Sequence, residues 1–164
     1  RYHSILFENP GWGFAGAGRD SQEQEIHVHR TLNVVGSGAQ HQTLFTDLVR
    51  HIDSVFADGD FASQPVFVVD TGCGDGRLLR RIYEHVKSNT PRGKALAEHP
   101  LTMVGVDFNR DSRAATELNL SRHAVPHLVL FGDVGKPADI MELLVRKGVD
   151  LSRSLHVRSF LDHN

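Results

Sequence analysis

The sequence predicts an α/β fold with a mainly parallel, doubly wound sheet and helices on both of its faces. Three observations lead to this prediction. Short apolar runs alternate with segments whose apolar residues recur every three or four positions, a pattern typical of strands and amphipathic helices in turn. A glycine-rich turn follows the first run, and aspartates follow the next two. Strands that alternate with helices are joined by right-handed crossovers, which produce a parallel sheet.

The N-terminal part differs from the rest in composition. Residues 1–38 are rich in glycine and polar side chains, and we expect an irregular arm or lid there, with a short strand at 26–35. The stretch Gly11–Gly16 formally matches G-x-G-x-x-G, but it follows Asn9-Pro10 rather than a strand, so we interpret it as a loop. The core domain is predicted to occupy residues 39–164.

The core begins with an amphipathic helix from Ala39 to Phe56, in which apolar residues form one stripe. A longer segment, Lys87–Pro100, contains two prolines and a glycine and is predicted to be an insertion or an exposed loop. The other expected strands and helices follow in alternation: Val66–Val69, Arg77–Val86, Leu101–Val106, Ser112–Ser121, His127–Phe131, Ala138–Lys147 and Leu155–Leu161.

The sequence stops directly after the fourth predicted strand. A complete doubly wound sheet continues with further strands, and an apolar strand left at a sheet edge is unfavourable. We therefore expect a sheet truncated after its fourth strand, in a fragment of a longer domain. Two alternatives are that the N-terminal arm covers this edge or that another polypeptide does.

Charge and composition narrow the range of partners. The chain has 18 basic and 20 acidic residues and a net charge of −2, so we expect no nucleic-acid partner. No apolar run approaches the roughly 20 residues that cross a bilayer, and the start lacks a secretory signal, so no membrane partner is expected. The single cysteine, Cys73, excludes an internal disulfide and a multi-cysteine zinc site. A cytoplasmic location is expected.

The segment Val66–Gly76 carries the most specific signal. An apolar strand leads into a turn with glycines at positions 72, 74 and 76, and a helix follows. Glycine permits positive φ and lets a ligand approach the backbone. The helix N-terminus presents unpaired N–H groups at the carboxyl end of a strand, where Rossmann-like sheets bind ligands. We therefore predict a cofactor site that includes Gly72, Cys73, Gly74 and Gly76.

The spacing of the glycines distinguishes between cofactors. A dinucleotide fingerprint would place its third glycine at position 77, which is Arg77. No Gly-Lys-Ser/Thr follows, so the P-loop pattern is absent. The observed pattern is D-x-G-x-G-x-G from Asp70 to Gly76, and it resembles the first motif of class I S-adenosylmethionine methyltransferases. The anion at Asp70 disfavours a pyrophosphate and suits a cofactor with an ammonium and a sulfonium group.

Two further aspartates extend this site. Asp107 ends the second predicted strand, where a carboxylate accepts hydrogen bonds from ribose hydroxyls; dehydrogenases place an acid similarly, so Asp107 alone fits either cofactor. Gly132-Asp133 resembles the family's adenine-contacting motif, and this resemblance implies that Phe108 and Val134 flank the adenine. The alternatives are a helix cap at Asp107 and an ordinary turn at Asp133.

The end of the sequence carries candidates for catalysis. The sequences of Thr71–Gly76 and Val157–His163 are similar to those of methyltransferase domains embedded in polyketide synthase loading modules. That resemblance implies C-methylation of a malonyl-type group on an acyl carrier protein. Because some members use iron or manganese, it also implies His163 as a metal ligand. Asp162 and His163 are candidates for a general base or a metal ligand, with a polar strand end as the alternative.

The leading hypothesis is methyl transfer from S-adenosylmethionine to a small-molecule or carrier-bound acceptor, by a domain with neighbours in a larger polypeptide. Two alternatives stay open. One is a non-catalytic cofactor-binding or scaffold domain, and the other is an NAD(P)-dependent oxidoreductase.

Overall fold

The structure is a computed structural model that describes residues 42–158. The predicted N-terminal arm, Asp162 and His163 lie outside the described residues. The described elements, in chain order, are α2 (Gln42–Phe56), β1 (Phe67–Thr71), α3 (Arg77–Asn89), α4 (Pro91–Lys94), β2 (Thr102–Asp107), α5 (Arg110–Arg122), β3 (His127–Phe131), α6 (Pro137–Arg146), the 3₁₀ helix η3 (Leu151–Arg153) and β4 (Ser154–Val157).

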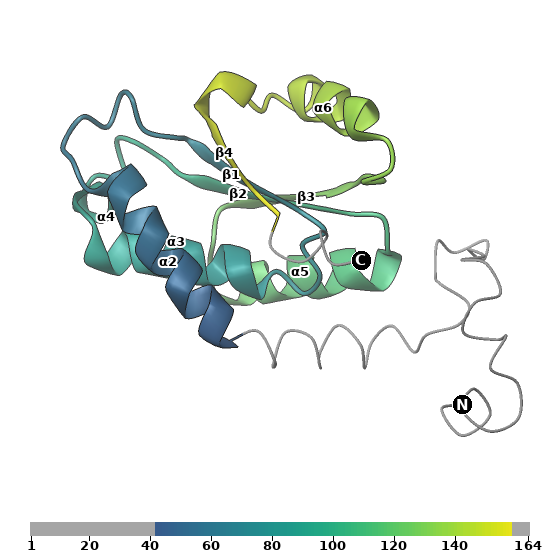
Figure 1. The fold of residues 1–164 in the computed structure, drawn as a ribbon, viewed down its shortest axis with the longest axis horizontal. Helices are drawn as coiled ribbons and strands as arrows, with labels where there is room; N and C mark the ends of the chain where they lie inside the picture. The colour runs from purple at the N-terminus through teal and green to yellow at the C-terminus, as the bar shows by residue number, and fades with distance from the viewer. Residues whose placement is uncertain (1–41, 159–164) are drawn as a thin grey trace, which may run out of the picture.

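The four strands form one parallel sheet in the order β3-β2-β1-β4 (Figure 1). The chain runs outward from β1 to β2 and β3, and then returns past β1 to form β4 on its other side. The winding direction therefore reverses between β1 and β4. In open α/β sheets, ligands bind outside the carboxyl ends of the strands at this kind of switch point. The predicted doubly wound parallel sheet is confirmed.

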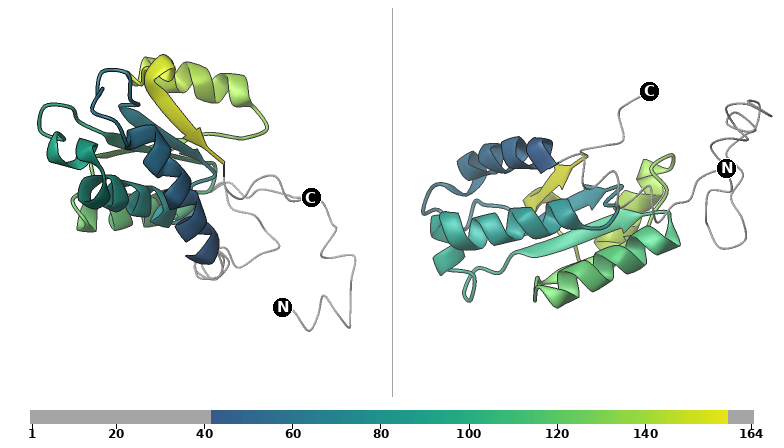
Figure 2. Two further views of the ribbon diagram at one scale, coloured as in Figure 1. Left: turned by 60° about the vertical axis from the view of Figure 1, so that its left-hand side comes forward. Right: turned by 90° about the horizontal axis from the view of Figure 1, so that it is seen from below.

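Helices cover both faces of the sheet (Figure 2). Because side chains alternate along a strand, Val68 and Met103 face a core shared with α2, α3 and α5. Their neighbours Val69 and Val104 face a second core, which α6 covers. All four of these strand residues are fully buried, so both sides of the sheet centre are packed. The rigid sheet that results fixes where the strand ends lie.

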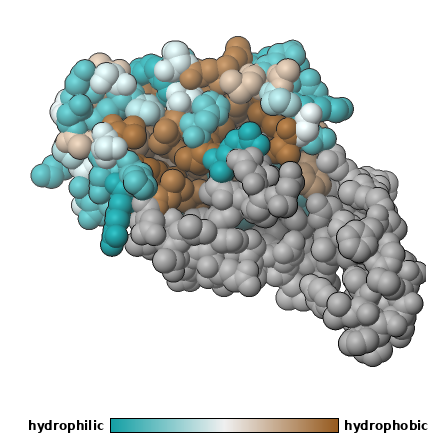
Figure 3. All heavy atoms as spheres, viewed as in Figure 1, coloured by the Kyte–Doolittle hydropathy of each residue, from teal (hydrophilic) through white to brown (hydrophobic). Residues whose placement is uncertain are grey.

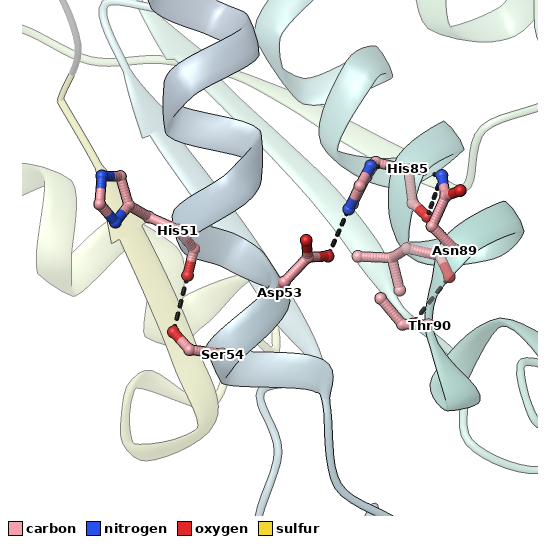
Figure 4. A network of polar contacts seen from close by, with 7 residues as sticks. His51, Asp53, Ser54, His85, Asn89 and Thr90 are labelled. Atoms are coloured by element: carbon pink, nitrogen blue, oxygen red, sulfur yellow. Dashed lines mark hydrogen bonds and ion pairs between the residues drawn. The ribbon is translucent and has the colours of Figure 1, made fainter.

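Helix α2 is attached to α3 by both apolar and polar contacts. Ile52 and Phe56 are buried in the core on the α3 side of the sheet. On the outer surface, the Asp53 carboxylate points toward the imidazole of His85 on α3 and pairs with its Nε2, as Figure 4 shows. The side-chain amide of Asn89 donates to the His85 carbonyl at 3.3 Å. The described part of the predicted apolar stripe, from Leu48 to Phe56, faces the core.

The segment after α3 corrects one prediction in part: it contains helix α4 and a buried arginine, although Pro91 and Pro100 are exposed. Helix α3 extends beyond its expected end, and Pro91 then occupies the first turn of α4. Arg92 is fully buried, and its guanidinium donates to the carbonyl oxygens of His99 at 2.9 Å, Phe61 at 3.0 Å and Pro100 at 3.2 Å. A Cβ at Gly93 would lie 2.1 Å from a carbonyl oxygen of α3. The glycine therefore permits a close approach of the two backbone segments.

Strand β4 is shorter than expected at its carboxyl end. It pairs with β1 as far as Val157, and Arg158 is already outside the strand. Within residues 42–158, no strand pairs with the other side of β4. Figure 3 shows apolar side chains gathered across the middle of the face seen in Figure 1. The half-buried Leu155 of β4 packs against the core that α2 and α3 share.

Among the described helices, none is long and apolar enough to cross a membrane.

Candidate functional site

The turn between β1 and α3 depends on three glycines with positive φ. The angles are 84° at Gly72, 58° at Gly74 and 72° at Gly76, all in the left-handed region that other L-residues rarely adopt. The Gly76 N–H donates to the Cys73 carbonyl at 2.9 Å, which closes the turn immediately before α3 begins at Arg77. The glycine spacing seen in the sequence is thus a requirement of the backbone path.

Strand β2 holds one side of this turn. The N–H groups of Gly72 and Cys73 donate to the Val106 carbonyl at 2.7 and 3.2 Å. The Gly74 N–H donates to Oδ2 of Asp107 at 3.1 Å. The carboxyl ends of β1 and β2 are therefore joined through both backbone and side-chain bonds, as expected for adjacent parallel strands.

Helix α5 holds the other side. The Thr116 hydroxyl donates to the Gly74 carbonyl at 3.0 Å, and the Asn119 side-chain amide donates to the Asp75 carbonyl at 2.8 Å. A Cβ at Gly76 would lie 2.9 Å from Cγ2 of Thr116, so the helix packs directly on the glycine. These α5 contacts were not predicted. Ser112, Thr116 and Asn119 share one face of α5 at helical spacing, but the sequence does not show that Ser112 and Thr116 are buried and Asn119 half-buried.

Asp70 lies next to the end of β1 and is 2% exposed. Its Oδ1 is buried and has no hydrogen-bond partner in the described part of the chain. Burial, and secondarily the nearby Asp107 carboxylate, raise the pKa of Asp70 to about 7. A cation placed beside this carboxylate would favour its ionised form. The site therefore combines a buried acceptor with a preference for positive charge.

Asp107 ends β2 and is 3% exposed. Besides the bond from Gly74, its Oδ1 accepts from the Asn109 N–H at 2.8 Å. A carboxylate at this strand end can accept hydrogen bonds from hydroxyl donors. The backbone carbonyl of Asp107 accepts from the Gly132 N–H at 3.2 Å, which links the ends of β2 and β3.

Asp133 follows β3 and accepts from the Gly135 N–H at 3.0 Å through Oδ1. Phe108 and Val134 are half-buried in the loops that follow β2 and β3. A Cβ at Gly132 would lie 2.5 Å from Cγ1 of Val106, so close packing explains this glycine. Asp133 therefore takes part in a turn, as its alternative interpretation expects, and lies after the strand next to Asp107.

These residues fit the cofactor suggested by the glycine motif. A Cβ at Gly74 would meet nothing within 4 Å, so the backbone is open to a ligand there. The unpaired Asp70 oxygen suits a cationic group, whereas a pyrophosphate would meet two buried carboxylates. A family model described as "AprA MT2-like domain", a methyltransferase family, matches residues 25–164.

The chain belongs to this methyltransferase family. A search of curated proteins gives no match. Membership of this family confirms the predicted class I S-adenosylmethionine-dependent methyltransferase domain. It is also consistent with the type that is embedded in polyketide synthases. The family implies S-adenosylmethionine as the methyl donor.

In the methyltransferase domain, Cys73 is a packing residue of the turn. Its thiol is buried, and Sγ lies 3.4 Å from Oγ1 of Thr116. Burial is the largest cause that raises its pKa well above the usual value, and the Asp107 and Asp70 carboxylates add to it. A thiol that stays protonated is a poor nucleophile. Cys73 is therefore a small residue of the turn rather than a nucleophile.

No group of three or more histidine, cysteine or acidic side chains that could hold a metal ion occurs within the described part of the methyltransferase domain. The predicted metal ligand, His163, and the second catalytic candidate, Asp162, lie outside that part. Their roles stay predictions.

Proposed function

We propose that this methyltransferase domain binds S-adenosylmethionine at the carboxyl ends of β1, β2 and β3 and methylates a malonyl-type carbon on an acyl carrier protein. The observation that carries the cofactor site is the bond from the Gly74 N–H to the Asp107 carboxylate, 3.1 Å long. It brings the glycine turn and the acidic end of β2 together at the switch point of the sheet. Such sites are where open α/β sheets bind nucleotide cofactors.

The methionine half is assigned to the glycine turn. Gly72, Cys73, Gly74 and Gly76 would border it with backbone atoms, and a Cβ at Gly74 would meet no protein atom within 4 Å. The buried carboxylate of Asp70 would balance the positive charge of the ammonium and sulfonium groups. This assignment explains why an acid with an unpaired oxygen is tolerated at the end of β1.

The nucleoside half is assigned to the ends of β2 and β3. Asp107, at the carboxyl end of β2 and bonded to the glycine turn, would accept hydrogen bonds from the ribose hydroxyls. Asp133 would accept from the exocyclic amine of adenine, with Phe108 and Val134 on either side of the ring. The bond between Asp107 and Gly132 supports this arrangement, because it holds the two strand ends at a fixed spacing.

The bound cofactor supplies a methyl group already activated by the sulfonium. The domain then has to align donor and acceptor and exclude water. Asp162 or His163 is proposed to take the proton that the acceptor carbon loses. His163 is also proposed as a ligand of iron or manganese. No group of three or more candidate metal ligands occurs among the described residues, and no step is assigned to a metal.

The acceptor and the setting rest on resemblance. The motif Val157–His163 and the family match support a carrier-bound acceptor. Neighbouring domains in a larger polypeptide and a cytoplasmic location are further parts of the proposal. The test is to incubate the full-length protein with S-adenosylmethionine carrying a labelled methyl group and malonyl-loaded carrier protein. Label on the malonyl carbon, found by mass spectrometry, is expected. Tight cofactor binding without turnover on carrier-bound or small-molecule acceptors would favour a non-catalytic scaffold instead.

A further inference from the structure

The side chain of Arg113, in the first half of α5, connects the two strand ends assigned to the nucleoside. Its Nη1 donates to the Phe108 carbonyl at 2.7 Å and to the Asp107 carbonyl at 3.2 Å. Its guanidinium carbon lies 5.2 Å from the centre of the Phe131 ring at the end of β3. One cation thus contacts the loop after β2 and the last residue of β3.

Two hydrogen bonds meet at one backbone atom, the carbonyl oxygen of Asp107. The Asp107 carbonyl oxygen accepts from Arg113 and also from the Gly132 N–H at 3.2 Å. Phe131 precedes Gly132 and is 48% exposed, so a cation above its ring restrains a side chain that the core does not hold. Arg113 therefore helps to fix the end of β2 at Asp107 and the loops that carry Phe108 and Asp133.

We propose that Arg113 is a positioning residue that sets the affinity of the domain for the nucleoside half of the cofactor. This inference rests on the proposed cofactor site. Arg113 acts through the Phe108 and Asp107 carbonyls and through Phe131, which hold the loops around the proposed nucleoside site.

The same helix provides an internal comparison at the other half of the site. Thr116 is fully buried, and its hydroxyl donates to the Gly74 carbonyl of the glycine turn at 3.0 Å. Replacement by valine keeps the shape and removes only the hydroxyl. Arg113 and Thr116 lie about one helical turn apart, yet they support different halves of the proposed site. Their variants should therefore affect different ligands.

The experiment measures dissociation constants of the full-length protein by calorimetry for two probes. S-adenosylhomocysteine contains both halves of the cofactor, and 5′-methylthioadenosine contains the nucleoside half without the amino-acid part. The variants are Arg113→Gln, Arg113→Lys and Thr116→Val. Arg122→Gln is the matched control, because Arg122 is an exposed arginine in the last turn of α5. The fitted number of sites reports the folded fraction, so partial unfolding is separated from weaker binding.

We expect Arg113→Gln to weaken the binding of both probes by the same factor, about tenfold. This is the order expected when a charge-assisted hydrogen bond is lost. Arg113→Lys restores part of the affinity because it keeps a cationic donor. Thr116→Val weakens the binding of S-adenosylhomocysteine alone, and Arg122→Gln changes neither dissociation constant. Wild-type affinity in Arg113→Gln, or a loss confined to S-adenosylhomocysteine, would overturn the role of Arg113 while leaving the cofactor site standing. A wild-type protein that binds neither probe would overturn the proposed function itself.

Discussion

Asp107 at the end of β2 accepts a hydrogen bond through Oδ2 from the backbone N–H of Gly74, in the turn after β1, at 3.1 Å. The two residues are separated by 33 positions in the sequence, and the parallel pairing of β1 with β2 brings them together. The same carboxylate accepts from the Asn109 N–H through Oδ1. Asp107 therefore organises the site before any ligand arrives, in addition to the ribose contact proposed for it.

Replacement of Asp107 by alanine is expected to weaken S-adenosylhomocysteine binding at least tenfold. The variant loses the proposed ribose acceptor and leaves two backbone N–H groups without their partner, and a hydrogen bond to a charged group is worth about 1.5–3 kcal/mol. Calorimetric titration measures the effect, and unfolding should stay cooperative. Asp139→Ala on the exposed surface of α6 is the control and should bind as the wild type does. Unchanged affinity in Asp107→Ala would argue against the ribose role.

Asp70 should make the stability of the ligand-free protein depend on pH. Its pKa is raised from 3.8 to about 7, so the folded state prefers the protonated form. Its contribution to stability is fully present below pH 3.8 and is lost as the pH rises through about 7. The loss amounts to at most about 4 kcal/mol, from roughly three pKa units at 1.36 kcal/mol each.

The measurement compares urea unfolding of the wild type with Asp70→Asn, which stays neutral at every pH. The stability of the wild type relative to the variant should fall between about pH 4 and 7 and then level off. A difference that is independent of pH would show that the Asp70 carboxyl is not perturbed.

Gly76→Ala should destabilise the fold by roughly 1–3 kcal/mol, the cost of a left-handed non-glycine residue. The φ of Gly76 is 72°, and the added Cβ would also lie 2.9 Å from Thr116 Cγ2. Gly59→Ala is the matched control, since a Cβ there would meet nothing within 4 Å and φ is not in the left-handed region. Urea unfolding midpoints measure both variants. Equal effects would contradict the assigned packing of α5 on the turn.

Cys73 should resist thiol reagents in the native protein. The thiol is buried against Thr116, and its pKa is raised, so little thiolate is available for attack. Because the chain has a single cysteine, the rate of reaction with a disulfide reagent reports this site alone. The rate is expected to follow the unfolded fraction as urea is added. Rapid modification without urea would indicate an exposed, reactive thiol.

Local patterns predicted the parts of the site that depend on local rules. The turn from Gly72 to Gly76 was readable because its φ angles require glycine, and Asp107 followed because the carboxyl ends of parallel strands share one edge. The roles of Arg113 and Thr116 were not readable. Their partners lie on other segments, and a polar helix residue looks the same in a sequence whether it meets water or a buried carbonyl.

The prediction for the segment around Arg92 failed in part, for a related reason. Arginine, proline and glycine normally indicate exposed turns, whereas here the guanidinium is buried because loop carbonyls from Phe61, His99 and Pro100 surround it. The cation can be buried only because the three-dimensional arrangement of those loops supplies hydrogen-bond acceptors for it. The pair of Asp53 and His85 likewise depends on how α2 docks on α3.

The most direct test of the central claim compares S-adenosylhomocysteine with NAD as stabilising ligands for the wild type and for Gly74→Ala. A Cβ at Gly74 would touch no protein atom within 4 Å, so it would project into the space assigned to the ligand, and its φ of 58° adds only local strain. Thermal unfolding should show that S-adenosylhomocysteine stabilises the wild type but not Gly74→Ala, and that NAD stabilises neither. Stabilisation by NAD alone, or equal stabilisation of both proteins by S-adenosylhomocysteine, would contradict a methyl-donor site at this turn.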